Sequence, residues 1–298
     1  MNENILFKGI LPALITPLND DATIRTQTVE PLMRWMLGKG VDGFYVLGGT
    51  GEGGVLAEKE RMIMAEESAH VLKGTGKKLI LHVGAADTQS AIRIARHAGQ
   101  VGADAISSVY PNFFCRYDVK EALNYYRALI DASGLPMLGY CQAMMQGADV
   151  VSFVDELMKV NGVIGVKYTF PNYYQMQRIK LLNSGNINVI NGPDESLLCG
   201  LSMGADGGIG TTYNLMSDWF VELYHRFTVN DVKGAQEMQF KINEVIAQLL
   251  GMNLIPAVRV ALEAYGFDVG DSAYPARRYT AEEKKEVVET LRKAGLPV

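Results

Sequence analysis

The chain has 298 residues, 48% of them hydrophobic and 20% charged, and a net charge of −5. These values are typical of a folded globular protein with a sizeable core, and they exclude disordered and fibrous classes. The charges are spread along the chain without a basic block, so neither nucleic acid nor an anionic membrane is an expected partner. We expect a small-molecule substrate.

Three cysteines, Cys115, Cys141 and Cys199, have no CxxC spacing and are odd in number, which favours reduced thiols over a disulfide framework. The first residues lack the positive charge of a signal peptide, and Pro12 and Pro17 interrupt their apolar run. No apolar stretch approaches the ~20 residues that a membrane helix needs. We therefore expect a cytoplasmic protein.

Short apolar or β-branched runs alternate along the chain with segments of helical period, which predicts repeated βα units around a parallel sheet. The predicted strands are, in chain order, 9–15, 43–47, 78–83, 105–109, 136–140, 162–167, 187–191 and 207–210. Eight such units and this chain length fit a single α/β domain, a (β/α)8 TIM barrel. The same periodicity is compatible with an open doubly wound sheet.

After the eighth predicted strand the pattern is helical only, near residues 215–228, 231–250, 254–265 and 280–294. The last helix begins with a capping box, Thr280 to Glu283, and ends at Gly295. No linker separates these helices from the barrel. We therefore predict a barrel core over residues 1–214. The eighth barrel helix and a C-terminal helical extension follow over 215–298, packed on the same domain.

Polar residues recur at or just beyond the carboxyl ends of the predicted strands. They are the glycine loop (residues 48–52), Tyr140, Lys167, the pair Asp194 and Glu195, and Thr211. Catalytic groups of (β/α)8 barrels lie at this end of the strands. Their placement therefore favours the barrel over the open sheet.

Lys167 ends an apolar strand, where nonpolar walls would disfavour its charged form. An ordinary lysine is neutral in roughly one molecule in a few thousand at pH 7, so a Schiff-base lysine needs such surroundings. Tyr140 ends the strand GLPMLGY, where its hydroxyl could relay a proton at the same rim. Taken singly, each residue is better explained by packing or pairing at a strand end.

The segment YVLGGTGEGG places Gly49, Gly51 and Gly54 in the spacing GxGxxG. That dinucleotide fingerprint belongs to the first strand of a βαβ unit, and Glu52 would place negative charge near a pyrophosphate. The backbone N–H groups of the glycine loop and the Thr50 hydroxyl suit a small carboxylate instead.

Metal chemistry finds little support, because no ligand spacing joins the four histidines, His70, His82, His97 and His225. The adjacent acids Asp194 and Glu195 lack a third ligand in the sequence. Cys141 has no obvious histidine partner and is predicted to be a small packing residue. No metal or cofactor is therefore expected.

These segments, in this order, resemble the N-acetylneuraminate lyase and dihydrodipicolinate synthase family of (β/α)8 enzymes, which bind pyruvate through a lysine imine. The resemblance covers essentially the barrel, through KGILPALITP, GGTGE, LPMLGY, GVIGVKYT, NGPDE and GADGGIGTTYN. It implies that Lys167 forms the imine with pyruvate and that Tyr140 moves protons during bond making or breaking. It also implies that Gly49 and Thr50 hold the pyruvate carboxylate.

Within the family, NGPDE with GIGTTYN looks like the lyase branch, which acts on sialic acid. By this resemblance, the contacts to the polyol chain of the substrate are Thr169, Gly192, Asp194, Glu195 and Thr211. Acids and hydroxyls suit a polyol because they pair with its many O–H groups. The synthase branch usually carries an arginine a few residues past its tyrosine, where this chain has Met145.

Three departures from the family pattern concern the substrate site. Gly49 stands where the lyase usually has serine or threonine, so a backbone group or water must replace one hydroxyl. Phe113 stands where the family commonly has a tyrosine shared with a neighbouring subunit. The usual YN-x-P has become YCQA, with Cys141, Gln142 and Ala143 after the tyrosine.

The resulting prediction is a class I aldolase that reversibly cleaves N-acetylneuraminate to pyruvate and N-acetylmannosamine, as a homotetramer. The alternative is a pyruvate-imine enzyme for another 2-keto-3-deoxy sugar acid, or, with less support, one that condenses pyruvate with aspartate semialdehyde. A noncatalytic sugar-acid-binding barrel is disfavoured by the presence of both Lys167 and Tyr140. A nucleotide-dependent oxidoreductase is disfavoured by Glu52.

Overall fold

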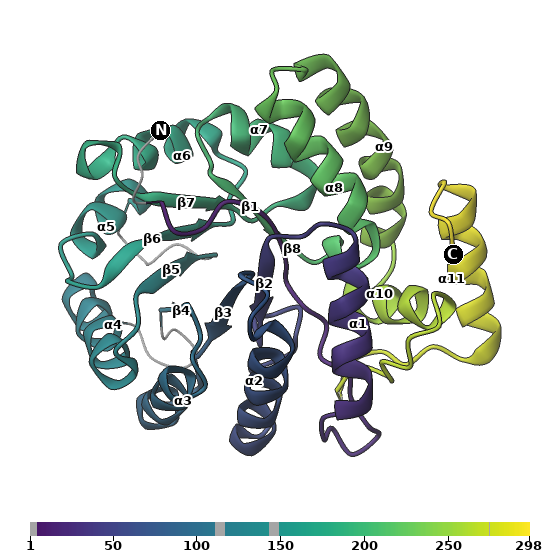
Figure 1. Cartoon of the computed structure of the whole chain (residues 1–298), viewed down its shortest axis with the longest axis horizontal. Helices are drawn as coiled ribbons and strands as arrows, with labels where there is room; N and C mark the ends of the chain where they lie inside the picture. Colours follow the sequence, from purple (N-terminus) through teal and green to yellow (C-terminus); the bar gives the residue numbers. More distant parts are fainter. Residues whose placement is uncertain (1–4, 111–116, 143–148, 274) are drawn as a thin grey trace.

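Strands and helices alternate along the chain as far as β8, and helices alone follow (Figure 1). The computed structural model describes residues 5–110, 117–142, 149–273 and 275–298. The strands are β1 (Gly9–Pro12), β2 (Gly43–Val46), β3 (Lys78–His82), β4 (Ala105–Val109), β5 (Met137–Cys141), β6 (Val163–Tyr168), β7 (Asn188–Asn191) and β8 (Gly207–Gly210). The helices between them are α1 (Thr26–Gly38), α2 (Glu58–Leu72), α3 (Thr88–Gln100), α4 (Val119–Ser133), α5 (Val150–Leu157), α6 (Tyr173–Lys180), η1 (Leu182–Gly185), η2 (Asp194–Ser196) and α7 (Leu197–Ser202).

The sheet closes on itself. Its strands pair in parallel in the order β1-β8-β7-β6-β5-β4-β3-β2. The two ends of this order meet where the Leu14 N–H donates to the Tyr45 carbonyl at 2.9 Å. Beside this bond, the Asp42 N–H donates to the Ile10 carbonyl at 2.8 Å. The fold is therefore the predicted (β/α)8 barrel, and the open doubly wound sheet is wrong.

Strand ends differ from the prediction where the sheet pairing stops or the backbone leaves the extended region. The first strand ends at Pro12 and not at residue 15, because the Ile15 N–H donates to the side chain of Asn214 at 3.0 Å. Strand β2 stops before Leu47, which has a φ of +66°. Strand β6 starts after Gly162, whose φ of +92° lies in the left-handed region that favours glycine.

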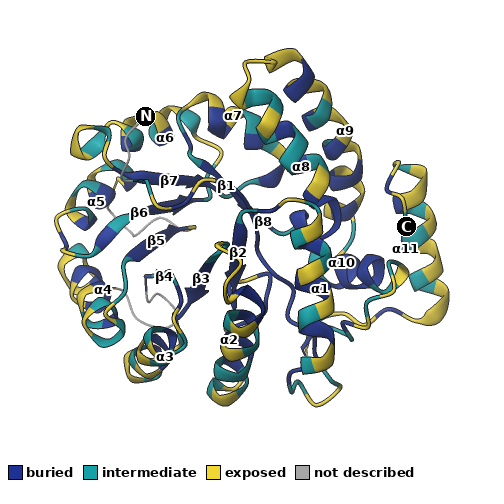
Figure 2. Ribbon diagram, viewed as in Figure 1, coloured by how far each residue is buried: buried dark blue, intermediate teal, exposed yellow. Residues whose placement is uncertain are grey.

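Buried apolar side chains form two layers. One fills the barrel interior and includes Leu11, Tyr45, Leu138, Tyr140 and Ile190. The other lies between the strands and the surrounding helices and holds most of the remaining core. Figure 2 shows the strands dark blue and the outer helix faces yellow, as expected when each helix buries one stripe. Side chains that alternate along a strand therefore face either the interior or the helices.

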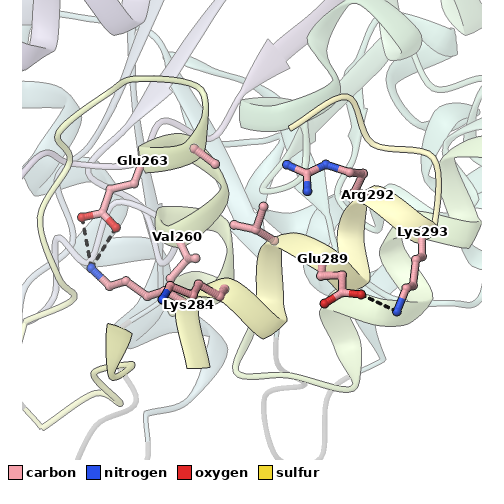
Figure 3. Close-up of a pocket in the computed structure, with 9 residues that line it drawn as sticks. Val260, Glu263, Lys284, Glu289, Arg292 and Lys293 are labelled. Atoms are coloured by element: carbon pink, nitrogen blue, oxygen red, sulfur yellow. Dashed lines mark hydrogen bonds and ion pairs between the residues drawn. The ribbon is translucent and has the colours of Figure 1, made fainter. Parts of the chain in front are cut away.

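The helices after β8 begin and end within two residues of their predicted positions: α8 (Tyr213–Thr228), α9 (Val232–Leu250), α10 (Leu254–Ala264) and α11 (Ala281–Lys293). The capping box of α11 is present, since Thr280 and Glu283 each accept the other's backbone N–H. Figure 3 shows α11 beside α10, where Lys284 Nζ lies 2.8 Å from Glu263 Oε2. A groove of about 790 Å³ between these helices is lined by none of the predicted site residues.

Helices α9 and α10 meet at a bend of 114° and have the length and composition of a membrane span only as a pair. In α10, Val258, Ala261 and Leu262 are fully buried in the protein core. No single helix among the described residues is long and apolar enough to cross a membrane.

Candidate active site

Lys167 lies near the end of β6 with its side chain inside the barrel. The register between β5 and β6 shifts by one residue at Ile164, which forms a bulge. Ile164 packs against the interior layer, whereas Val163 and Val166 belong to the outer layer. Strict alternation would place Lys167 on the same face as Val163. The bulge therefore turns the lysine into the barrel.

Two aromatic rings face the side-chain nitrogen of Lys167. Its Nζ lies 4.4 Å from the ring centroid of Tyr140 and 4.8 Å from that of Tyr45. Tyr140 is also the register partner of Lys167 on β5. Lys167 is 6% exposed and forms no hydrogen bond or ion pair with any residue that the structure describes. The predicted imine lysine and the predicted proton-transfer tyrosine are thus neighbours in a buried aromatic setting.

His82, the last residue of β3, packs edge-on against Tyr140. The two ring centroids are 6.3 Å apart, at an interplanar angle of 89°. Burial, together with the charges of Arg61 and Lys167, lowers the pKa of His82 to about 3, so its imidazole is neutral. Arg61 of α2 holds this strand end by donating to the carbonyls of His82 at 2.8 Å and Gly84 at 3.0 Å. His82 therefore contributes packing rather than charge.

The glycine loop is held from behind by a buried ion pair. Arg259 of α10 donates to Glu52 Oε2 at 2.5 Å, and the two side chains are 3% and 8% exposed. The Ala273 N–H donates to the other carboxylate oxygen of Glu52 at 3.2 Å. Arg259 also donates to the Thr16 carbonyl at 2.8 Å, which follows β1. Glu52 thus has a structural partner, and the C-terminal helices fix the loop that follows β2.

The hydroxyls of Thr50 and Thr211 meet across the barrel rim, with their Oγ1 atoms 2.6 Å apart. Thr50 belongs to the glycine loop and Thr211 follows β8, so both predicted binding residues lie at one place. Gly49 beside them is exposed, and a Cβ atom at this position would meet nothing within 4 Å. The structure therefore leaves room for the side chain that the family pattern has at position 49.

Asp194 is buried in η2 and joins the start of α8. Its Oδ2 accepts hydrogen bonds from the N–H and the hydroxyl of Thr212, each at 2.7 Å. Burial raises the pKa of Asp194 to about 6, against the lowering effect of these hydrogen bonds. Its Oδ1 lies beside Gly210, where a Cβ atom would collide with it. One carboxylate oxygen is therefore committed to the fold, and the other remains for a ligand.

We expect Asp194→Asn to change how stability depends on pH. Because the pKa of Asp194 is raised from 3.8 to about 6, the folded state binds this proton more tightly than the unfolded chain does. The contribution of Asp194 to stability is therefore largest below pH ~4 and declines by about 3 kcal/mol as pH rises through about 6. Urea unfolding of both proteins from about pH 4 to pH 8 measures this decline. A pH-independent difference between them would contradict the assignment.

The other predicted polyol contacts differ in burial: two lie together after β6 and β7, and the third is exposed. The Thr169 hydroxyl, just after β6, is buried and has no hydrogen-bond partner among the described residues. A side chain at Gly192 would collide with that hydroxyl, so the close approach requires glycine. Glu195 is exposed, and its backbone carbonyl accepts a hydrogen bond from Asn243 at 2.9 Å. The structure thus brings Thr169 and Gly192 together, whereas Glu195 faces solvent.

Two of the residues that depart from the family pattern, Phe113 and Ala143, lie outside the described residues, as do Met145, which stands in place of the synthase arginine, and Cys115. Cys141 is described. It is 4% exposed, and burial raises the pKa of its thiol to about 12, so it is a neutral thiol. The prediction that Cys141 is a packing residue is confirmed.

Sequence reasoning missed Tyr45, the role of His82 and the partner of Glu52. Tyr45 lies three residues before the start of the glycine loop, and alternation along β2 was a signal that it faces opposite to Phe44 and Val46. His82 was counted only as a potential metal ligand. Arg259 lies 207 residues from Glu52 in the sequence, and no local pattern connects them.

Comparison with known proteins agrees with this geometry. The sequence profile of the Dihydrodipicolinate synthetase family matches residues 6–294. The chain belongs to this family. A relative named N-acetylneuraminate lyase, from Rhizobium meliloti, is 33% identical over 291 residues, which cover 98% of this chain and 95% of the relative.

Solved structures show the same fold. Proteus mirabilis N-acetylneuraminate lyase superposes with a TM-score of 0.91 at 29% identity, over 97% of this chain and 99% of that one. A catalytic lysine mutant of the Ruminococcus gnavus sialic acid aldolase has a TM-score of 0.89 at 26% identity, over 97% of this chain and 96% of that one. This family member therefore shares its barrel with sialic acid lyases along nearly its whole length.

Proposed function

We propose that the protein is a carbon–carbon lyase that forms a Schiff base between Lys167 and the keto group of its substrate. The observation that carries this proposal is the position of Lys167, buried inside the barrel beside its register partner Tyr140. The similarity of this chain to sialic acid lyases, one of which has a catalytic lysine, also supports the proposal. Apolar and aromatic walls disfavour hydration of the amine and of the imine formed from it.

The reaction follows from these groups. The neutral amine of Lys167 adds to the keto carbon, and uptake of one proton with loss of water gives an iminium ion. The iminium withdraws electrons, so the bond between the carbons alpha and beta to it breaks as the beta hydroxyl gives up its proton toward Tyr140. An aldehyde and an enamine result. Protonation of the enamine and hydrolysis of the imine release pyruvate.

The substrate that fits best is N-acetylneuraminate, with N-acetylmannosamine as the aldehyde product. Among the described residues, Thr169 offers a buried hydroxyl without a hydrogen-bond partner, and Asp194 offers one carboxylate oxygen that accepts no hydrogen bond. Thr50 and Thr211 place two further hydroxyls at the same rim. A polyol chain can pair with such groups, whereas an apolar chain would leave them unsatisfied. A shorter 2-keto-3-deoxy sugar acid is the second candidate, because Glu195 faces solvent and Gly49 lacks a hydroxyl.

Release of pyruvate from N-acetylneuraminate and from several short keto-deoxy acids tests the choice of substrate. We expect kcat/KM to be at least about tenfold higher for N-acetylneuraminate, since a shorter acid leaves polar groups of the site unpaired. A preference for a short acid would defeat the sialic acid assignment and leave the imine chemistry standing.

We further propose a cytoplasmic homotetramer that uses neither metal nor cofactor. Sedimentation and metal analysis of the purified protein check the last two points.

We expect Gly49→Ser to tighten binding of the substrate carboxylate. The site has open space for the added side chain, and one hydroxyl would supply a hydrogen bond that the natural chain lacks. Such a bond is worth roughly 0.5–1.5 kcal/mol, which corresponds to a KM about two- to tenfold lower. Gly49→Ala is the matched control, because it adds a Cβ atom without a hydroxyl. Equal KM values for the two variants would show that the hydroxyl makes no contact with the substrate.

A further inference from the structure

Tyr45 presents its ring face to the amine that is proposed to react. The two rings beside Lys167 Nζ, at 4.8 Å for Tyr45 and 4.4 Å for Tyr140, are both within the ~6 Å range of a cation–π contact. They stand nearly perpendicular to each other, at 85° with centroids 6.2 Å apart. No carboxylate in the described part of the chain pairs with Lys167. The two ring faces therefore compensate a buried positive charge at close range, beside the longer-range effect of Asp194, which forms no ion pair with Lys167.

The position and charge of Tyr45 are fixed. The residue is 1% exposed, and its hydroxyl donates to Ser107 Oγ of β4 at 3.1 Å. Its ring also packs against that of His82, with centroids 6.3 Å apart. Burial raises the pKa of the Tyr45 phenol well above its ordinary value, so it stays neutral. Tyr45 can therefore act on Lys167 through its ring face and not by exchanging a proton.

We infer that the ring of Tyr45 stabilises positive charge at Nζ of Lys167, first as the ammonium ion of the free enzyme and then as the iminium ion of bound pyruvate. This inference rests on the proposed imine function. An ammonium ion and a keto group give an iminium ion and water, so the charge stays at Nζ. A neutral amine and a keto group need one proton from solvent to give the same products. The ring therefore favours both cations over the neutral amine.

This balance predicts a pH dependence. At subsaturating pyruvate, the iminium fraction is constant with pH while the free amine is protonated. The iminium fraction falls once the pH is high enough for the free amine to lose its proton. A ring face with less negative charge shifts that fall to lower pH. Titratable groups that face Lys167 come from four elements: Tyr45 of β2, His82 of β3, Tyr140 of β5 and Asp194 of η2. The pKa of His82 is about 3 and that of Asp194 about 6, so neither titrates above pH ~7.5.

The experiment varies the negative charge on the face of the ring at residue 45 and keeps the shape of the ring nearly constant. Tyr45→Phe keeps the ring and removes only the hydroxyl, whereas Tyr45→trifluorophenylalanine, introduced during translation, weakens the negative face of a ring of nearly the same size. Each protein is equilibrated with subsaturating pyruvate from about pH 7 to pH 10.5 and treated briefly with cyanoborohydride, which reduces the iminium ion in preference to the neutral imine. The initial rate of adduct formation at Lys167 is then measured by peptide mapping. The series is repeated with Tyr140→Phe, which removes the other phenol that faces the amine.

We expect the pH at which the iminium fraction has fallen by half, the midpoint, to be the same in Tyr45→Phe as in the wild type. The trifluorinated variant should have its midpoint about one pH unit lower. Midpoints that do not respond to fluorination, with the Lys167 adduct present in every protein, would overturn the role of Tyr45 and leave the imine function intact. Absence of any adduct in the wild type would overturn both proposals.

Discussion

We expect Lys167→Met to lower turnover by at least about a thousandfold, because the variant has no nucleophile for the keto group. Stability should be unchanged or higher. The buried amine of Lys167 has no ion pair among the described residues, so its removal leaves no charge unpaired, and the methionine keeps most of the buried apolar stem. Pyruvate release and urea unfolding measure the two effects separately.

Lys285→Met is the matched control for this variant, because Lys285 is exposed on α11 and far from β6 in the chain. It should leave both turnover and stability near those of the wild type. Turnover retained in Lys167→Met would rule out the covalent mechanism. Lost turnover together with an unfolded protein would instead show that Lys167 is needed for the fold.

The second large effect concerns the ion pair between Glu52 and Arg259. Replacing one partner leaves the other as an uncompensated buried charge, so we expect Glu52→Gln to lower the free energy of unfolding by about 3–5 kcal/mol. Arg259→Met should cost a similar amount, since the carbonyls of Thr16 and Val269 also lose a donor. The double variant should lose less than the sum of the two, because neither charge is then left alone.

Urea unfolding of the four proteins in this cycle measures the coupling. Glu289→Gln is the control, because Glu289 pairs with Lys293 on the exposed face of α11 and its replacement should change the free energy of unfolding little. The single variants at Glu52 and Arg259 should also raise KM, since the glycine loop that carries Thr50 loses its support. Additive losses in the cycle would mean that the pair does not act as a unit.

Much of the fold could be predicted from the sequence because its signals are local. The capping box of α11 needs only Thr280 and Glu283, and β6 shows its apolar run directly. The closing contact between β1 and β2 was not visible in any pattern. The barrel was inferred from the recurrence of polar residues after strands, and the bond from Leu14 to Tyr45 now confirms it.

The site was less predictable because two of its features depend on contacts distant in sequence. The bulge at Ile164, which turns Lys167 into the barrel, depends on how β6 pairs with β5 and not on any residue type in the strand. The partner of Glu52 comes from α10, beyond the barrel. The strand ends of the sequence predicted that Lys167 and Tyr140 share one barrel rim, whereas their catalytic roles were predicted only through the family resemblance. Their register pairing on β5 and β6 places them side by side.

The most direct test of the imine mechanism is reduction of the wild-type protein with borohydride in the presence of pyruvate, followed by intact-mass measurement and peptide mapping. We expect one adduct per chain, located on Lys167, and none without pyruvate or in Lys167→Met. An unmodified Lys167, or an adduct spread over exposed lysines, would contradict the proposed mechanism.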